Sequence, residues 1–158
     1  MKTKTIKEIL TACEDGLGIH IDRDIIANLY DSYISLFPTL SGTEYMFVQE
    51  KENECESIWF FMKENIGIAT IQDGKFELFP IKNRITRMVL EELKYADPRS
   101  RKGIITISFS FQIDSEKVRT LKEGGSRKKC TYLLRLITDY FLPNLVQGRA
   151  WNAYNKSL

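Results

Sequence analysis

The residues best suited to chemistry in this chain form the basic run Gly124–Lys129, which reads Gly-Gly-Ser-Arg-Lys-Lys. A serine that can cap a helix would place the backbone N–H groups of the helix start beside three cationic side chains. That combination suits a phosphate or another anion. The run lacks the G-x-x-x-x-G-K-[S/T] pattern of a P-loop, and the common alternative is a solvated, capped loop. The run predicts an anion site at Ser126, Arg127, Lys128 and Lys129.

A second basic segment, Arg99–Lys102, extends the candidate anion site by Arg99, Arg101 and Lys102. Nucleic-acid binding would use such residues on phosphates and exposed aromatic side chains for stacking. The aromatic residues of this chain mostly occupy periodic positions that are typical of a core. The sequence also lacks the paired RNP motifs and a helix-turn-helix signature. Solubility is therefore the alternative role for these charges.

Signals for catalysis and for metal binding are poor. His20 is the only histidine, so any Ser-His or Cys-His pair would have to use it. Glu92-Leu93-Lys94 has the E-x-K spacing of metal-dependent nucleases. In those enzymes the motif lies on a strand, whereas this segment is predicted to be a helix. Cys13, Cys55 and Cys130 are odd in number and lack zinc-ligand spacing, which indicates mostly buried thiols. We expect no enzymatic activity, no cofactor and no metal.

A formal net charge of +2 conceals a division of charge along the chain. Residues 1–80 contain 7 Lys and Arg against 14 Asp and Glu, whereas residues 81–158 contain 16 against 7. The two halves therefore carry −7 and +9. Such asymmetry indicates an anionic partner for the basic half, unless the halves neutralise each other across one fold. It also predicts distinct acidic and basic faces.

The length of 158 residues and a hydrophobic content of 43% predict one globular domain, 1–158. Its first part, 1–40, is expected to be helical, and 41–158 to hold a sheet and a C-terminal helix. Asp22 is a good N-cap for a helix that ends at Pro38, and Ser126 for one that runs through Phe141. A shorter helix is predicted within residues 3–13.

Several β-rich runs follow the helical part, and Asp73-Gly74 is a strong hairpin signal between two of them. The predicted strands are Tyr45–Gln49, Ser57–Lys63, Ile66–Ile71, Phe76–Pro80 and Ile104–Ile113. In the last of these, alternation predicts a buried face that begins at Ile105. Glu50–Glu56 is expected to be an acidic loop, and Ser115–Glu123 a short helix or a loop.

The segment Asn83–Ala96 fits two structures. Ile85, Met88, Val89 and Leu93 fit a helix capped by Asn83, yet the segment also fits a two-faced strand. We predict a helix. The fold class is then α+β, a central antiparallel sheet with an N-terminal helical segment and a C-terminal helix packed on it. With a strand instead, the element order is similar to that of a pleckstrin-homology-like domain, a curved β-roll closed by the C-terminal helix.

These features predict a small cytosolic interaction module, an adaptor, inhibitor or regulator that acts through charge-complementary surfaces on a protein partner. The alternative is a binder of phosphate-bearing ligands, such as nucleic acid or a nucleotide, through the basic half. No apolar stretch reaches the roughly 18 residues that a transmembrane helix needs. The basic N-terminus is not followed by the apolar core of a secretory signal, so a cytoplasmic location is expected. The oligomeric state stays open.

Overall fold

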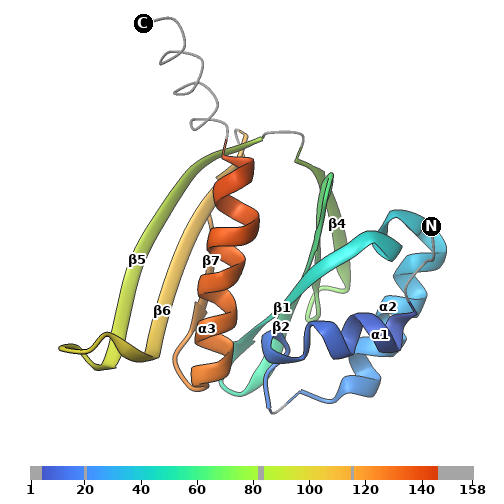
Figure 1. Cartoon of the computed structure of the whole chain (residues 1–158). Helices are drawn as coiled ribbons and strands as arrows, with labels where there is room; N and C mark the ends of the chain where they lie inside the picture. The colour runs from blue at the N-terminus through green and yellow to red at the C-terminus, as the bar shows by residue number, and fades with distance from the viewer. Residues whose placement is uncertain (1–4, 20, 82–83, 115, 146–158) are drawn as a thin grey trace, which may run out of the picture. The chain divides into compact units, whose positions relative to one another are not determined.

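The computed structural model describes residues 5–19, 21–81, 84–114 and 116–145 (Figure 1). The chain divides into two compact units, Met1–Phe79 and Pro80–Leu158. The division of charge follows the same boundary, because the first unit contains 14 acidic and 7 basic residues and the second 7 and 16. The two units thus carry net charges of opposite sign, −7 and +9. That the whole chain is one domain, and that it has separate acidic and basic faces, stay predictions.

The first unit combines helices with a four-stranded antiparallel sheet, in the order β1-β2-β3-β4. Its helical elements are α1 (Ile6–Ala12), η1 (Glu14–Gly16), α2 (Arg23–Leu36) and η2 (Pro38–Gly42), and its strands are β1 (Thr43–Lys51), β2 (Glu54–Met62), β3 (Asn65–Thr70) and β4 (Lys75–Pro80). The predicted cap of α2 is confirmed, since Asp22 Oδ1 accepts a hydrogen bond from the backbone N–H of Asp24 at 2.9 Å. One apolar cluster joins both helices to the sheet and includes Ile9, Ile26, Val48 and Phe60.

The expected acidic loop over Glu50–Glu56 is shorter than predicted. β1 and β2 continue into it and pair down to Lys51 and Glu54. Only Glu52 and Asn53 remain in the turn, with φ values of 55° and 64°. Paired left-handed residues of this kind suit a tight hairpin, which explains how a strongly polar stretch stays within strand pairing.

The second unit combines a three-stranded antiparallel sheet with one helix. Its elements are β5 (Ile85–Asp97), β6 (Lys102–Ile113), β7 (Arg119–Glu123) and α3 (Arg127–Leu136), which continues as a π-helical turn η3 (Ile137–Phe141) and a 3-10 turn η4 (Leu142–Asn144). α3 packs against β6 and β7, and β5 and β6 are long and curved (Figure 1). The ring centroid of Phe141 lies 4.9 Å from that of Phe109 and 4.7 Å from that of Phe111.

The predicted α+β class is confirmed, with a helical segment first, antiparallel strands next and a helix last. The strands form two hydrogen-bonded sheets, however, where the sequence predicted one central sheet. Among the residues that the structure describes, no helix is long and apolar enough to cross a membrane.

The helix predicted over Asn83–Ala96 is wrong, because residues 85–97 form β5; Asn83 itself lies outside the described residues. Register shifts in the pairing with β6 leave one extra residue in β5 at Thr86 and another at Glu91. Each such bulge lengthens the spacing between side chains on the same face from two residues to three. The residues paired with the buried apolar positions of β6 therefore fall at Ile85, Met88, Leu90, Leu93 and Tyr95. The steps of three from Ile85 to Met88 and from Leu90 to Leu93 break the period of two and also occur on a helix face, which explains why a helix was predicted.

Two further differences concern β6 and the segment after it. The buried face of β6 begins at Ile104, which is 7% exposed, and not at Ile105, which is 37% exposed. A register shift between Lys94 and Tyr95 leaves Ile105 as the extra residue on β6. The segment Ser115–Glu123, predicted as a short helix or a loop, contains β7, while Ser115 lies outside the described residues.

Candidate anion-binding surface

The start of α3 is organised around the carboxylate of Glu123, the last residue of β7. Its Oε2 accepts hydrogen bonds from the backbone N–H groups of Gly125, at 2.8 Å, and Ser126, at 2.9 Å. Ser126 is the predicted N-cap, and its Oγ accepts from the backbone N–H of Lys129 at 3.3 Å. A carboxylate of the chain itself thus takes two of the backbone donors that the sequence assigned to an external anion.

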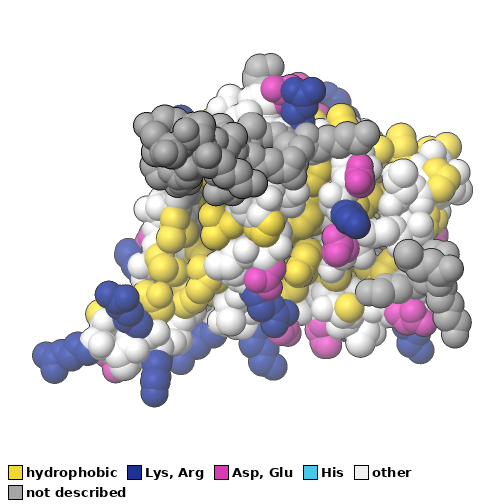
Figure 2. Space-filling view, turned by 45° about the horizontal axis from the view of Figure 1, so that its top comes forward, with side chains coloured by type: hydrophobic (Ala, Val, Ile, Leu, Met, Phe, Trp, Pro, Cys, Tyr) yellow, Lys and Arg dark blue, Asp and Glu magenta, His cyan; other side chains and the backbone are white. Residues whose placement is uncertain are grey.

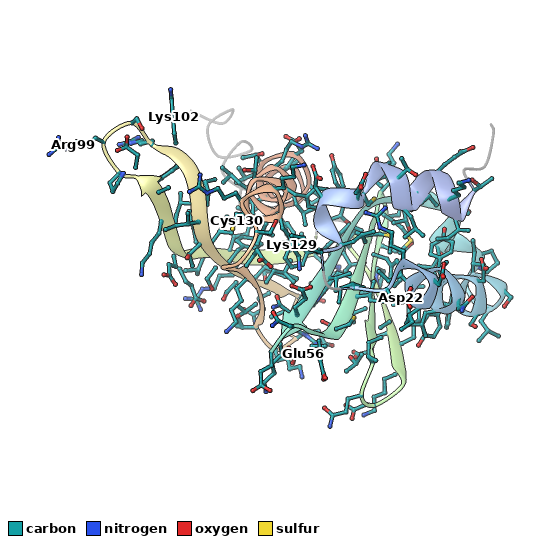
Figure 3. All side chains as sticks on the ribbon, turned by 90° about the horizontal axis from the view of Figure 1, so that it is seen from below. Asp22, Glu56, Arg99, Lys102, Lys129 and Cys130 are labelled. Carbon is teal, nitrogen blue, oxygen red and sulfur yellow. The ribbon has the colours of Figure 1, made fainter. Side chains whose placement is uncertain are left out.

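Lys129 is buried, although the sequence predicted an exposed cation at this position. Its side chain is 1% exposed, and its Nζ lies 3.3 Å from Oε1 of Glu123, whose side chain is 8% exposed (Figure 3). A signal for this burial exists in the sequence, since Lys129 precedes Leu133 by four residues and Leu136 by seven. That spacing puts Lys129 on the apolar face of the helix. The assumption that Lys129 is solvent-exposed is therefore wrong.

The neighbouring thiol of Cys130 is buried in the same region. It contacts the backbone carbonyl oxygen of Glu123 at 3.5 Å. Burial raises the pKa of Cys130 to about 11, and the negative charge of Glu123 contributes to the rise. A thiol with so high a pKa is a poor nucleophile near neutral pH. Cys13 is likewise buried, Cys55 is half-buried, and none of the three forms a disulfide.

The second basic segment occupies the tip of the β5–β6 hairpin. Asp97 Oδ1 accepts hydrogen bonds from the backbone N–H groups of Arg99, at 3.0 Å, and Ser100, at 3.4 Å. Its Oδ2 accepts from Ser100 Oγ at 2.8 Å, and this bond, followed by the two backbone bonds, holds the pKa of Asp97 below its ordinary value. The turn leaves Arg99, Arg101 and Lys102 exposed. Figure 3 shows Arg99 and Lys102 projecting from the tip, away from α3.

Arg127 connects the two basic segments. A Cβ atom placed on Gly103 would lie 3.4 Å from Arg127 Nη1, so the guanidinium lies against the hairpin directly after Lys102. Gly103 has a φ of +68°, a conformation that glycine adopts without strain. We call Arg99, Arg101, Lys102 and Arg127 the basic end. Lys and Arg side chains gather at the hairpin tip, at the lower left of Figure 2.

The structure thus brings most of the predicted anion-site residues together but not all of them. Arg127 joins the hairpin cations, Lys128 is exposed on the first turn of α3, and Lys129 is buried. Ser126 serves as the helix cap. The geometry therefore fits an anion site only at the exposed cations. Anion binding by these residues stays a prediction.

Sequence reasoning missed one neighbour of the basic end. Ile105 follows Gly103 by two residues and is exposed because it is the extra residue of a bulge on β6. A bulge depends on pairing with another strand, so no local signal marks it. Among the described residues, the large exposed hydrophobic side chains are all aliphatic. The basic end therefore has an aliphatic neighbour, Ile105, and no aromatic ring that the structure describes is fully exposed.

The other sites considered from the sequence have little support in the structure. Glu92 and Lys94 do lie on a strand, β5, as the E-x-K chemistry would need, but Lys94 Nζ contacts Glu92 Oε1 at 3.1 Å. His20 lies outside the described residues. In the described part of the chain, no group of three or more His, Cys, Asp or Glu side chains is arranged to hold a metal ion.

Comparisons with known proteins give no function for this chain, so a proposal about its function rests on its own geometry. No family model matches the chain, and neither a curated protein nor a solved structure matches it.

Proposed function

We propose that this chain is a non-enzymatic interaction module of the cytoplasm, an adaptor, inhibitor or regulator, whose basic end binds an acidic segment of a protein partner. The observation that carries the proposal is the position of the Arg127 guanidinium against Gly103. It joins basic residues from two distant parts of the sequence into one surface. Arginine is enriched in protein interfaces, where its planar group binds carboxylates with two hydrogen bonds.

The cations of the basic end remain available for a partner. Ion pairs among the described residues of the second unit include those of Arg84 with Asp114, Lys94 with Glu92 and Lys129 with Glu123. None of the four residues of the basic end belongs to these pairs. The carboxylate of Asp97 is nearby, but its oxygens accept hydrogen bonds from the turn itself. The basic end therefore keeps an excess of positive charge.

Two features favour a protein partner over a phosphate-bearing ligand. The backbone N–H groups of Gly125 and Ser126, which would bind a phosphate at the helix start, already donate to Glu123. The exposed hydrophobic neighbour is Ile105 and not an aromatic side chain on which a base would stack. An acidic protein segment with aliphatic side chains complements such a surface.

The test compares three forms of the full chain. The first is wild type, and the second is the tip variant with Arg99→Glu, Arg101→Glu and Lys102→Glu. The third is a matched control with the same change of charge in the first unit, at the exposed residues Lys7, Lys63 and Lys75. The probes are a labelled peptide of alternating Glu and Leu and a single-stranded oligonucleotide of equal charge. Affinities are measured over a series of salt concentrations.

We expect wild type and the control to bind the peptide, and the tip variant to bind at least about tenfold more weakly. Affinity capture from nuclease-treated extract of the native host, with the same three forms, then identifies the partner by mass spectrometry. Equal binding by the tip variant would overturn the role of the basic end. Stronger binding of the oligonucleotide, with a steep log-linear loss in salt, would favour the phosphate-bearing ligand instead.

A further inference from the structure

A hollow lies on the sheet of the second unit, on the face opposite α3. Its volume is about 260 Å³, and it is lined by Arg87, Val89, Glu91, Ser110, Phe111, Gln112 and Val118. The pairing of β5 with β6 shows which residues belong to this face. Val89 pairs with Ser110, whereas the next pair, Leu90 and Phe109, points to the side on which Phe109 contacts Phe141. Phe111 borders the hollow as well, and its ring packs on Phe141 beneath α3, so the hollow lies directly over the packed interior.

The floor of the hollow is a hydroxyl group held by two neighbouring strands. Ser110 on β6 is 3% exposed although it lies on the outer face. Its Oγ donates to Glu91 Oε1 on β5 and is 2.8 Å from Thr120 Oγ1 on β7. The bulge at Glu91 turns this carboxylate to the same side as Val89, two positions earlier. The carboxylate is thus oriented by a buried partner.

The two ends of the hollow carry opposite charges. Arg87 pairs with Gln112 across the strands and supplies an exposed guanidinium. Glu91 uses Oε1 for Ser110, which leaves Oε2 for a ligand. Among the described ion pairs, neither Arg87 nor Glu91 takes part. The side chain of Val89 lies between them in the strand, and Val118 adds a second aliphatic side chain.

We propose that this hollow binds a small zwitterion, a free aliphatic amino acid whose carboxylate contacts Arg87 and whose ammonium contacts Glu91. The guanidinium binds a carboxylate with charge-assisted hydrogen bonds, and Glu91 Oε2 accepts from the ammonium. Val89 and Val118 provide the apolar contact for the aliphatic side chain. The volume of about 260 Å³ lies just below the range of about 300–1,000 Å³ for drug-sized ligands, which fits a ligand of amino-acid size. This site is independent of the basic end.

The first experiment uses wild-type protein and three related probes, followed by NMR chemical shifts of the backbone amides of Val89 and Ser110. The probes are leucine, N-acetyl-leucine, which lacks the ammonium group, and leucinamide, which lacks the carboxylate. We expect leucine to shift both amides and to bind about tenfold more tightly than either analogue, because each analogue loses one charge-assisted contact. Equal affinities for the three probes, or no shift with leucine, would overturn the proposal.

The second experiment assigns the charges to their residues. Arg87→Gln should abolish the preference for leucine over leucinamide, and Glu91→Gln should abolish the preference for leucine over N-acetyl-leucine. Glu91→Gln retains an oxygen that accepts from Ser110, so the floor of the hollow is kept. Arg84→Gln and Glu92→Gln are the matched controls, since both residues lie on the same segment but outside the lining. If wild type prefers leucine, unchanged preferences in the two lining variants would contradict the assignment of the charges.

Discussion

Lys129 Nζ lies 3.3 Å from Glu123 Oε1, and both side chains are almost completely buried in the second unit. The second oxygen of the same carboxylate accepts hydrogen bonds from the backbone of Gly125 and Ser126. One carboxylate therefore ties the end of β7, the glycine turn and the first turn of α3 together. This arrangement fixes where α3 begins, and with it the position of Arg127 at the hairpin.

Replacing Lys129 by Met should lower the free energy of unfolding by about 3 kcal/mol or more, because Glu123 would keep a buried charge without its counter-ion. Lys128→Met is the matched control: Lys128 is the preceding residue and is exposed, so its replacement should change stability by no more than about 0.5 kcal/mol. Urea unfolding of the three proteins measures both effects. Similar losses in the two variants would show that the buried pair has no special role.

In the first unit, Gly67 on β3 makes room for the ring of Phe76 on β4. A Cβ atom at Gly67 would lie 3.1 Å from Phe76 Cζ, and this ring also stacks on Tyr33 at 4.6 Å between centroids. Gly67→Ala should therefore cost about 1–3 kcal/mol through overpacking. Gly42→Ala, where a new Cβ meets nothing within 4 Å, should be close to neutral. Thermal or urea unfolding distinguishes them, and equal effects would mean that the ring moves aside freely.

The turn at the hairpin tip should depend on the ionisation of Asp97. Its hydrogen bonds from Ser100 and from the backbone lower its pKa below the ordinary value of 3.8. The ionised carboxylate therefore stabilises the turn above that value, and this contribution is lost as the pH falls through the lowered pKa. An NMR titration of the Asp97 carboxyl should give a midpoint below 3.8, and Ser100→Ala should raise it. An unchanged midpoint in that variant would show that the hydroxyl contributes nothing.

At high pH, two buried acids should destabilise the fold as they lose their protons. Burial raises the pKa of Cys130 from 9.0 to about 11 and that of Tyr30 from 10.0 to about 12. The unfolded chain releases these protons first, so the stabilising contribution is complete below the ordinary values. It declines as the pH rises, from 9 to 11 for Cys130 and from 10 to 12 for Tyr30.

Urea unfolding measured at successive pH values across that window tests this expectation. Cys130→Ala should remove the decline that begins at pH 9, and Tyr30→Phe the decline that begins at pH 10. Tyr30→Phe also loses a hydrogen bond, because Tyr30 Oη donates to the backbone carbonyl of Leu40 at 2.7 Å. Its baseline stability is therefore lower, and the slope with pH is the informative quantity. A wild-type slope that persists in both variants would assign the alkaline effect to other groups.

Features that depend on neighbouring residues could be predicted from the sequence. The caps at Asp22 and Ser126 are local, because a side chain accepts from a backbone N–H two or three residues later. The turn at Asp73-Gly74 is local for the same reason, and Gly74 adopts a φ of 63°. Alternation located most of β6 because its buried face follows a period of two. The division of charge was also visible by counting, although only the structure shows that it coincides with two compact units.

The remaining features depend on residues that meet only after folding. β5 was mistaken for a helix because its bulges arise from pairing with β6, and the same pairing exposes Ile105. Helical spacing marks Lys129 as a residue of the apolar face of α3, but only the structure shows that Glu123 on the preceding strand supplies its counter-charge. The contact of Arg127 with the hairpin at Gly103 joins segments more than twenty positions apart. The sequence by itself determined which groups are present and where helices begin, whereas tertiary packing decided which charges reach the solvent and which of them meet.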